Sequence, residues 1–339
     1  MRLAALVLCM LAAESAAWRC PLFDTGRRLS CQLADPQFKQ RAFPEMPDLR
    51  VVAAMFHRSL RRGQSLYFVG DSLSVQHFRA LMCMLMEFGV PVHTEAPIAG
   101  GDTPKDTLRG RQCFTLNPPN GALICGIASA EACSEPIGRR RKLAGNLMGG
   151  QCTALARSVG ELRLRAGDTL VLSDGTRHRN EIDSLSVELS EVRHQLQALM
   201  PHAQSSGVSV VWRETFAQHF ATDSGMYANA TGGPCRPVLD STIPRARNAA
   251  VTALARSFNA TILEAFEASL ERWDDHVGLH SSYARTTGLD CTHWCEPSPL
   301  LLWLSAQLLH VTAHKHVHRE VAKRLKYLPG PPLAHLHLQ

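Results

Sequence analysis

The sequence predicts an α/β protein, a three-layer sandwich in which helices cover both faces of a central, mostly parallel sheet. Short apolar runs that suit buried strands lie at 65–70, 169–175, 208–214 and 260–266. Each run is followed by a stretch with the apolar spacing of a helix, and this alternation is typical of parallel sheets. The chain has 339 residues, of which 45% are hydrophobic, so it can bury a sizeable core.

Apolar periodicity identifies the helices expected between these strands. Behind the first run, "LSVQHFRALMCMLMEFG" has apolar residues at helical spacing and a stop signal at Gly89. Behind the second run, leucines recur at Leu185, Leu189, Leu196 and Leu199. The third run precedes a helix around "PRARNAAVTALARSF", and the fourth leads towards "DCTHWCEPSPLLLWLSAQLL".

A single domain is expected over 18–330, with a tail at 331–339. Its first part, 18–47, is rich in Cys, Arg and Pro, which favours an irregular arm held by disulfides. The pattern is poor over 90–152, apart from a strand expected at 122–129. We expect that stretch to be an insertion over the carboxyl edge of the sheet, where parallel sheets bind their ligands.

The first 17 residues have the features of a secretory signal peptide. They contain one early Arg2, an apolar core from Leu3 to Ala13 and small residues up to Ala17. Cleavage is expected after Ala17. An uncleaved segment would instead be a short anchor, and membrane association is expected only in that case.

Cysteines and glycosylation sequons favour the same compartment. Beyond the signal peptide the cysteine count is even, which in the secretory pathway favours disulfides. The "NAT" sequons at Asn229 and Asn259 agree, so a Golgi-lumen or secreted glycoprotein is expected. The disulfide candidates are Cys20, Cys31, Cys83, Cys113, Cys125, Cys133, Cys152, Cys235, Cys291 and Cys295.

The chain is mildly basic, with a formal net charge of +6. Its basic clusters, at 139–142 and in "HKHVHREVAKRLK", are interpreted as solvated surface, and no nucleic-acid partner is expected. The histidines of the second cluster alternate with Lys and Arg, which would repel a cation. No metal site is therefore expected.

The stretch "YFVGDSLSVQHF" runs from the first strand into the first helix and places Ser72 at the helix start. Two roles fit this position. As a cap, the Ser72 hydroxyl would accept a hydrogen bond from a later amide. As a nucleophile, it would lie where helix amides stabilise an oxyanion, provided that a histidine takes its proton.

A late block, "GLDCTHWCEPSP", contains that histidine. Asp290 and His293 are three residues apart, so in a turn the carboxylate can bind one imidazole nitrogen while the other faces outward. The alternative is that Asp290 caps the next turn and His293 is a surface residue. Cys291 and Cys295 flank the pair, and a disulfide at either would pin this loop.

Together these blocks resemble the PC-esterase family. "RRGQSLYFVGDSLSVQHFRALMCML" and "LDCTHWCEPSP" are similar to the motifs of its plant members, the trichome-birefringence-like polysaccharide O-acetyltransferases, which are related to SGNH/GDSL hydrolases. Between them, "WRCPLFDTG", "AGDTLVLSDG" and "VVWRETFAQHFATDSGMYANATGGPC" resemble further family blocks in the same order. The resemblance spans most of the chain and implies an SGNH-hydrolase-like fold.

Carried over residue by residue, the resemblance implies Ser72 as the nucleophile, His293 as its base and Asp290 as the orienting carboxylate. Gly70 and Asp71 complete the first block.

The resemblance also bears on the oxyanion hole. Gly175 would donate to the oxyanion, whereas Ser173 stands where plant relatives usually have asparagine. The resemblance implies three donors, namely the Ser72 amide, the Gly175 amide and the side chain at position 173, and this departure affects the third of them.

Two further residues have open roles. Arg213, in "WRETF", could orient the acyl donor or sugar, or equally could tie loops to the sheet edge. Trp294 could stack on a sugar face or wall off the site. His219 is a weaker candidate than Arg213 for orienting the acyl donor or sugar.

The expected function is transfer of acetyl groups to glycan hydroxyls through an acetyl-serine, with an acetyl donor as co-substrate and no bound cofactor. Two alternatives remain open. One is a carbohydrate acetylesterase, with water as the acceptor and the same residues. The other is a non-catalytic, secreted glycan-binding protein of the same fold.

Overall fold

The computed structural model describes residues 43, 46–60, 62–94, 111–116, 122–128, 164–173, 183–227, 233–278, 290–296 and 298–316. The expected signal peptide, nearly all of the arm and the tail lie outside these residues.

Seven strands form one mixed, mostly parallel sheet, as expected from the sequence. Their order is β2-β3-β4-β1-β5-β6-β7, with β4, β1, β5, β6 and β7 all parallel. β2 and β3 extend one edge with antiparallel pairing. The bounds are β1 Leu66–Gly70, β2 Val92–Thr94, β3 Arg111–Leu116, β4 Ala122–Ala128, β5 Thr169–Leu172, β6 Ser209–Arg213 and β7 Thr261–Leu263.

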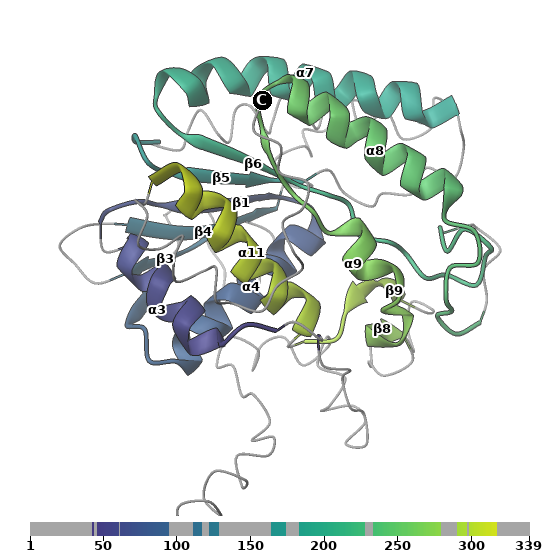
Figure 1. Ribbon diagram of the computed structural model, residues 1–339, viewed down its shortest axis with the longest axis horizontal. Helices are drawn as coiled ribbons and strands as arrows, with labels where there is room; N and C mark the ends of the chain where they lie inside the picture. The colour runs from purple at the N-terminus through teal and green to yellow at the C-terminus, as the bar shows by residue number, and fades with distance from the viewer. Residues whose placement is uncertain are drawn as a thin grey trace, which may run out of the picture.

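Helices cover both faces of this sheet (Figure 1). On one face lie α3 (Leu49–Leu60), α4 (Ser72–Glu87) and α11 (Pro299–His316), and on the other lie α7 (Asp183–Ser205) and α8 (Thr242–Ser257). At one end of the sheet stand α9 (Phe266–Leu270), the short helix η5 (Trp273–Asp275) and a hairpin of β8 (His276–Gly278) and β9 (Asp290–Trp294).

Alternation along the central strands divides the core into two layers. In β1, Leu66 and Phe68 pack with α3, α4 and α11, whereas Tyr67 and Val69 pack with α7 and α8. Successive side chains of a strand point to opposite faces, so a strand covered on both faces must be apolar throughout. This explains why β1, β5 and β6 are buried along their whole length and why their central residues are apolar.

The structure adds elements that the sequence analysis did not anticipate: α3, β2 and β3, and also α9, η5 and the β8–β9 hairpin, so that Asp290 and His293 lie on a strand rather than in a turn. The range 90–152 was expected to lie over the carboxyl edge, yet β2, β3 and β4 belong to the sheet itself. Short strands on an antiparallel edge are hard to recognise, because pairing with a neighbour rather than their own pattern stabilises them. The rest of that range lies outside the described residues.

Two disulfides are described. Cys113 and Cys125 face each other in the β3–β4 register, with Cα atoms 4.1 Å apart. The second disulfide, Cys235–Cys291, ties the segment before α8 to strand β9. Disulfides persist in oxidising compartments, and these two indicate such an environment for this chain. None of the helices within the described ranges is long and apolar enough to cross a membrane.

Candidate active site

The candidate site lies at the carboxyl edge of the sheet, where β1, β5 and β6 end side by side. Leu172 pairs with Val69 and with Trp212, so the residues that follow the three strands meet at one edge. Polar residues gather there: Asp71 follows β1, Ser173 follows β5 and Arg213 ends β6.

Asp71, rather than Ser72, caps helix α4. Its Oδ1 accepts hydrogen bonds from the amides of Leu73 at 3.0 Å and Ser74 at 3.3 Å. Ser72 is the first residue of the helix, and its side chain is exposed. With the capping role filled by Asp71, the Ser72 hydroxyl is free to face another partner.

That partner is His293. Its Nε2 lies 2.7 Å from Ser72 Oγ, although the two residues are 221 positions apart in the chain. The other ring nitrogen, Nδ1, lies 2.8 Å from Asp290 Oδ2. The structure thus joins Ser72, His293 and Asp290 in one hydrogen-bonded chain, called the triad below.

Local geometry sets the proton positions in the triad. Asp290 Oδ1 accepts hydrogen bonds from the amides of Thr292 at 3.1 Å and His293 at 3.0 Å, which fixes the carboxylate at the start of β9. Oδ2 then accepts the Nδ1–H of His293. In the neutral ring Nε2 consequently carries the lone pair, and it can accept the Ser72 hydroxyl proton.

The pKa shifts of Asp290 and His293 also suit a role of His293 as a base. Burial opposes ionisation of Asp290, but hydrogen bonds from His293 and from backbone amides outweigh it and lower the pKa of Asp290 to about 2. Burial likewise opposes the charged form of His293, but the Asp290 carboxylate outweighs it and raises the pKa of His293. Asp290 therefore stays ionised, and it stabilises the charged form of the His293 ring.

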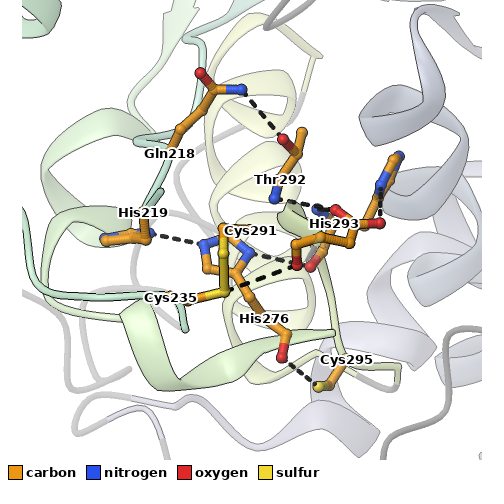
Figure 2. The surroundings of a disulfide bond; sticks show 9 residues. Gln218, His219, Cys235, His276, Cys291, Thr292, His293 and Cys295 are labelled. Carbon is orange, nitrogen blue, oxygen red and sulfur yellow. Dashed lines mark hydrogen bonds and ion pairs between the residues drawn. A yellow bond between two sulfur atoms is a disulfide. The ribbon is translucent and has the colours of Figure 1, made fainter. Parts of the chain in front are cut away.

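The β9 strand is held from several sides (Figure 2). The disulfide to Cys235 fixes Cys291, one residue after Asp290, and Gln218 Nε2 donates to Thr292 Oγ1 at 3.1 Å. From helix α4, Gln76 donates to the carbonyl oxygen of Trp294 at 3.0 Å and accepts from the Trp294 amide at 3.2 Å. The helix that carries Ser72 is thereby tied directly to the strand that carries His293.

Arg213 lies beneath the turn that carries Ser72. It is 2% exposed, and its guanidinium donates to the Leu73 carbonyl oxygen at 3.0 Å and to Ser173 Oγ at 2.8 Å. Burial lowers its pKa to about 10, and the nearby Asp71 opposes that shift. Of the two roles left open by the sequence, these contacts favour the arginine that ties loops to the sheet edge.

Ser173 and Gly70 belong to the same buried network. Ser173 Oγ lies 2.5 Å from Ser74 Oγ and also accepts from Arg213, so two protein partners engage its hydroxyl. A Cβ on Gly70 would stand 2.3 Å from Ser74 Oγ and 2.7 Å from Ser173 Oγ. Gly70 is needed because no side chain fits where β1 and β5 end together.

Trp294 walls off the site instead of presenting a stacking surface. It has no exposed surface and packs against His276, with ring centroids 4.0 Å apart, and against Phe216. The sugar-stacking role considered for Trp294 therefore does not fit this position. Gly175, the expected second oxyanion donor, lies outside the described residues, as does the sequon residue Asn229.

Three neighbours of the triad were missed by the sequence analysis: Gln76, His276 and Glu296. Gln76 had a usable signal, because four residues after Ser72 it lies on the same helical face. His276 and Glu296 had none. Glu296 is buried, and desolvation, partly offset by Arg79 and Gln76, raises its pKa to about 7.

Comparison with known proteins assigns no family to the chain. No protein-family model matches it, and no curated protein matches it either.

Proposed function

We propose that the protein is a carbohydrate O-acetyltransferase of the secretory pathway, with an SGNH-hydrolase-like fold of the PC-esterase type. The observation that carries the proposal is the triad: Nε2 of His293 lies 2.7 Å from Ser72 Oγ, and Asp290 orients the same ring. The motif resemblance of the chain selects acetyl groups and glycan hydroxyls as substrates. The two disulfides agree with this compartment.

In the first half-reaction, Ser72 Oγ attacks the carbonyl carbon of the acetyl donor while His293 Nε2 takes the hydroxyl proton. The helix start supports this step, because the capping bonds of Asp71 go to Leu73 and Ser74 and leave the Ser72 amide to face the oxyanion. The leaving group departs with the proton from His293, and Ser72 carries the acetyl group.

In the second half-reaction, a glycan hydroxyl attacks the acetyl-serine. His293 accepts the proton of that hydroxyl and returns it to Ser72 Oγ as the carbon–oxygen bond to Ser72 breaks. The products are the acetylated glycan and free enzyme. No cofactor is needed to balance either step.

A related function, carbohydrate acetylesterase, is favoured by one specific observation. The side chain of Ser72 is exposed, so water can reach an acetyl-serine at this position. The non-catalytic glycan-binding alternative is disfavoured, because a protein that had lost its chemistry would have no reason to keep a hydroxyl, imidazole and carboxylate aligned.

Incubation of the purified protein with an activated acetyl ester, with and without oligosaccharide, tests the proposal. Mass spectrometry of the peptide that contains Ser72 is expected to show an added acetyl group. Ser72→Ala is expected to lose that label and to lower turnover by about 10³-fold or more. Ser257→Ala, which removes an exposed hydroxyl at the end of α8, is the matched control and should retain turnover.

The products then separate the candidates. Acetylated sugar supports the transferase, whereas free acetate alone supports the esterase. Absence of both from the wild-type protein, with glycan binding that is unchanged in Ser72→Ala, would reject catalysis.

A further inference from the structure

Two buried histidines lie directly behind strand β9 and outside the triad. His219 is fully buried and His276 is 2% exposed, and the rings contact each other through His219 Nδ1 and His276 Nε2, 2.7 Å apart (Figure 2). The remaining nitrogens face carbonyl oxygens. His219 Nε2 lies 2.9 Å from the Leu270 oxygen, and His276 Nδ1 lies 3.0 Å from the His293 oxygen.

Counting protons in this arrangement gives an unusual result. A carbonyl oxygen only accepts hydrogen bonds, so His219 Nε2 and His276 Nδ1 must each carry a proton. In neutral rings the two facing nitrogens would then both be bare lone pairs at 2.7 Å. Two acceptors at that distance repel, unless a further proton lies between them and turns the contact into a charge-assisted hydrogen bond.

The charges around the pair bear on that extra proton. Burial lowers the pKa of both rings, to about 4 for His219, and His219 further opposes the charged form of His276. Carboxylates act in the opposite direction: Asp274 favours the charged form of His219, and Asp290 favours that of His276, while His293 opposes it. In the turn before β8, the ion pair Arg272–Asp275 adds no net charge.

Sharing one proton between the two rings lowers the free-energy cost of burying its charge. One charge is spread over two rings, and each ring nitrogen of the pair has a partner, so His219 and His276 together bind a proton that neither would bind alone.

The pair touches the triad through the backbone. The His276 proton on Nδ1 is donated to the carbonyl oxygen of His293, and the His276 ring stacks on Trp294, the next residue of β9. Loss of the shared proton would leave repelling lone pairs, and the simplest relief is a change of His276 tautomer that gives up its bond to His293. The position of the proposed base then loosens.

We propose that His219 and His276 share one buried proton and that His276, held by this bond, is a positioning residue that fixes the backbone of His293 for the reaction. The positioning role rests on the proposed function, whereas the shared proton stands on its own.

The proton is tested by NMR of the full-length protein with ¹⁵N-labelled histidine, between pH 6 and 9. A downfield ring N–H resonance with cross-peaks to nitrogens of both His219 and His276 is expected near neutral pH, and it should disappear as pH rises. Two neutral tautomers throughout this range in the folded protein would overturn the shared proton.

Two substitutions separate the proton from the positioning role. In His219→Asn the amide nitrogen replaces Nδ1 and can donate to His276 Nε2, so His276 keeps its bond to His293 without an extra charge. In His276→Gln the amide nitrogen replaces Nε2, and the bond to the His293 carbonyl oxygen is lost. His194→Asn, an exposed histidine on α7, is the matched control.

Turnover of the acetyl ester by these variants gives the second readout. Wild-type kcat/KM should fall at high pH in parallel with the NMR resonance, and His219→Asn should lack that alkaline fall. His276→Gln should lower kcat by about tenfold or more at every pH with KM little changed. Thermal unfolding checks that each variant is folded, and His194→Asn should match the wild type.

These measurements distinguish failure of the positioning role from failure of the proposed function. An alkaline fall that persists in His219→Asn, or a His276→Gln variant with wild-type kcat, would overturn the positioning role. A wild-type protein without any acetyl turnover overturns the proposed function and the positioning role together. The NMR result still decides the shared proton in that case.

Discussion

At the scale of single residues, the three-residue spacing of Asp290 and His293 accounts for two of the three members of the triad. Asp290 Oδ1 binds the amides of Thr292 and His293, so its Oδ2 is left facing the His293 ring. This local arrangement needs no distant part of the chain. Only Ser72, 221 residues away from His293, has to be supplied by the fold.

The first prediction at this scale concerns pH. His293 acts as a base only when neutral, and its pKa is raised, so kcat/KM for an acetyl ester should rise with pH on the acidic side of its profile, with the midpoint of that rise above the ordinary value of about 6.5. Asp290→Asn removes the cause of the shift. The variant should have a lower midpoint and turn over about 10⁴-fold more slowly.

The Asp290–His293 pair also makes the stability of the fold depend on pH. Because the folded-state pKa of Asp290 is lowered to about 2, its ionised form stabilises the fold above the unfolded value of about 3.9, and that contribution disappears as pH falls towards 2. Equal acid unfolding curves for the wild type and Asp290→Asn would contradict this assignment.

A second prediction concerns His77, which is fully buried in helix α4. Neither ring nitrogen has a hydrogen-bond partner among the described residues, and the ring packs edge-on against Phe68. Removing a buried polar group that lacks a partner is stabilising, so His77→Leu should raise the free energy of unfolding by about 1 kcal/mol. Chemical denaturation at pH 8 measures this gain.

Lowering the pH should increase the difference in unfolding free energy between His77→Leu and the wild type. Burial, with a smaller contribution from Arg213, lowers the pKa of His77, so the unfolded chain binds a proton that the folded one does not. The wild type should lose stability relative to His77→Leu as pH falls below about 6.5. A gap that is constant between pH 8 and pH 5 would refute this reading.

At the scale of elements, the turn from β1 into α4 positions Ser72, the proposed nucleophile. Asp71 caps the helix, Ser72 begins it, and Arg213 binds the Leu73 carbonyl oxygen from below. Gln76, one turn later, ties the helix to β9. The turn therefore works as a unit, and its tightest point is Gly70.

Gly70→Ala should disturb this unit. The added Cβ would collide with Ser74 Oγ and with Ser173, which is bound to Arg213. We expect a loss of about 1–3 kcal/mol of unfolding free energy together with a fall in acetyl-ester turnover. Gly126→Ala is the matched control, because its Cβ would meet the Phe78 ring away from the triad and should cost stability with little effect on turnover of the folded protein.

At the scale of the whole molecule, the sheet and the Cys235–Cys291 disulfide bring the two halves of the site together. β1 supplies Ser72 at the centre of the sheet, whereas β9 stands in a separate hairpin beyond β7 in the chain. The disulfide links this hairpin to the segment before α8 across 56 residues. It should matter for stability and for the position of His293.

Removal of this bond by the double substitution Cys235→Ser and Cys291→Ser should lower the free energy of unfolding by about 4 kcal/mol, from the loop that it closes. Turnover measured at temperatures below the unfolding temperature should also be lower than in the wild type, because β9 loses its covalent link to Cys235. The matched control removes Cys113–Cys125, which spans 12 residues between paired strands. That variant should lose about 3 kcal/mol and retain its turnover.

Local and repeating patterns could be recognised without the structure. The continuous apolar runs predicted β1, β5, β6 and β7, and the helical spacing predicted α4, α7 and α8, because each pattern reflects the face that its own element must bury. The antiparallel strand β3 was missed, because it is defined by pairing with β4 and not by its own composition.

The sequence by itself determined the alternation of strands and helices and the local reach of Asp290 to His293, whereas it offered Ser72 as the cap that the structure assigns to Asp71. Only the tertiary structure decided that Ser72 meets His293, that Arg213 braces the turn before α4 and that Trp294 is buried. The physical reason is range. Hydrogen bonds within a turn follow from spacing along the chain, whereas contacts between distant residues depend on which strands pair and on which faces are covered.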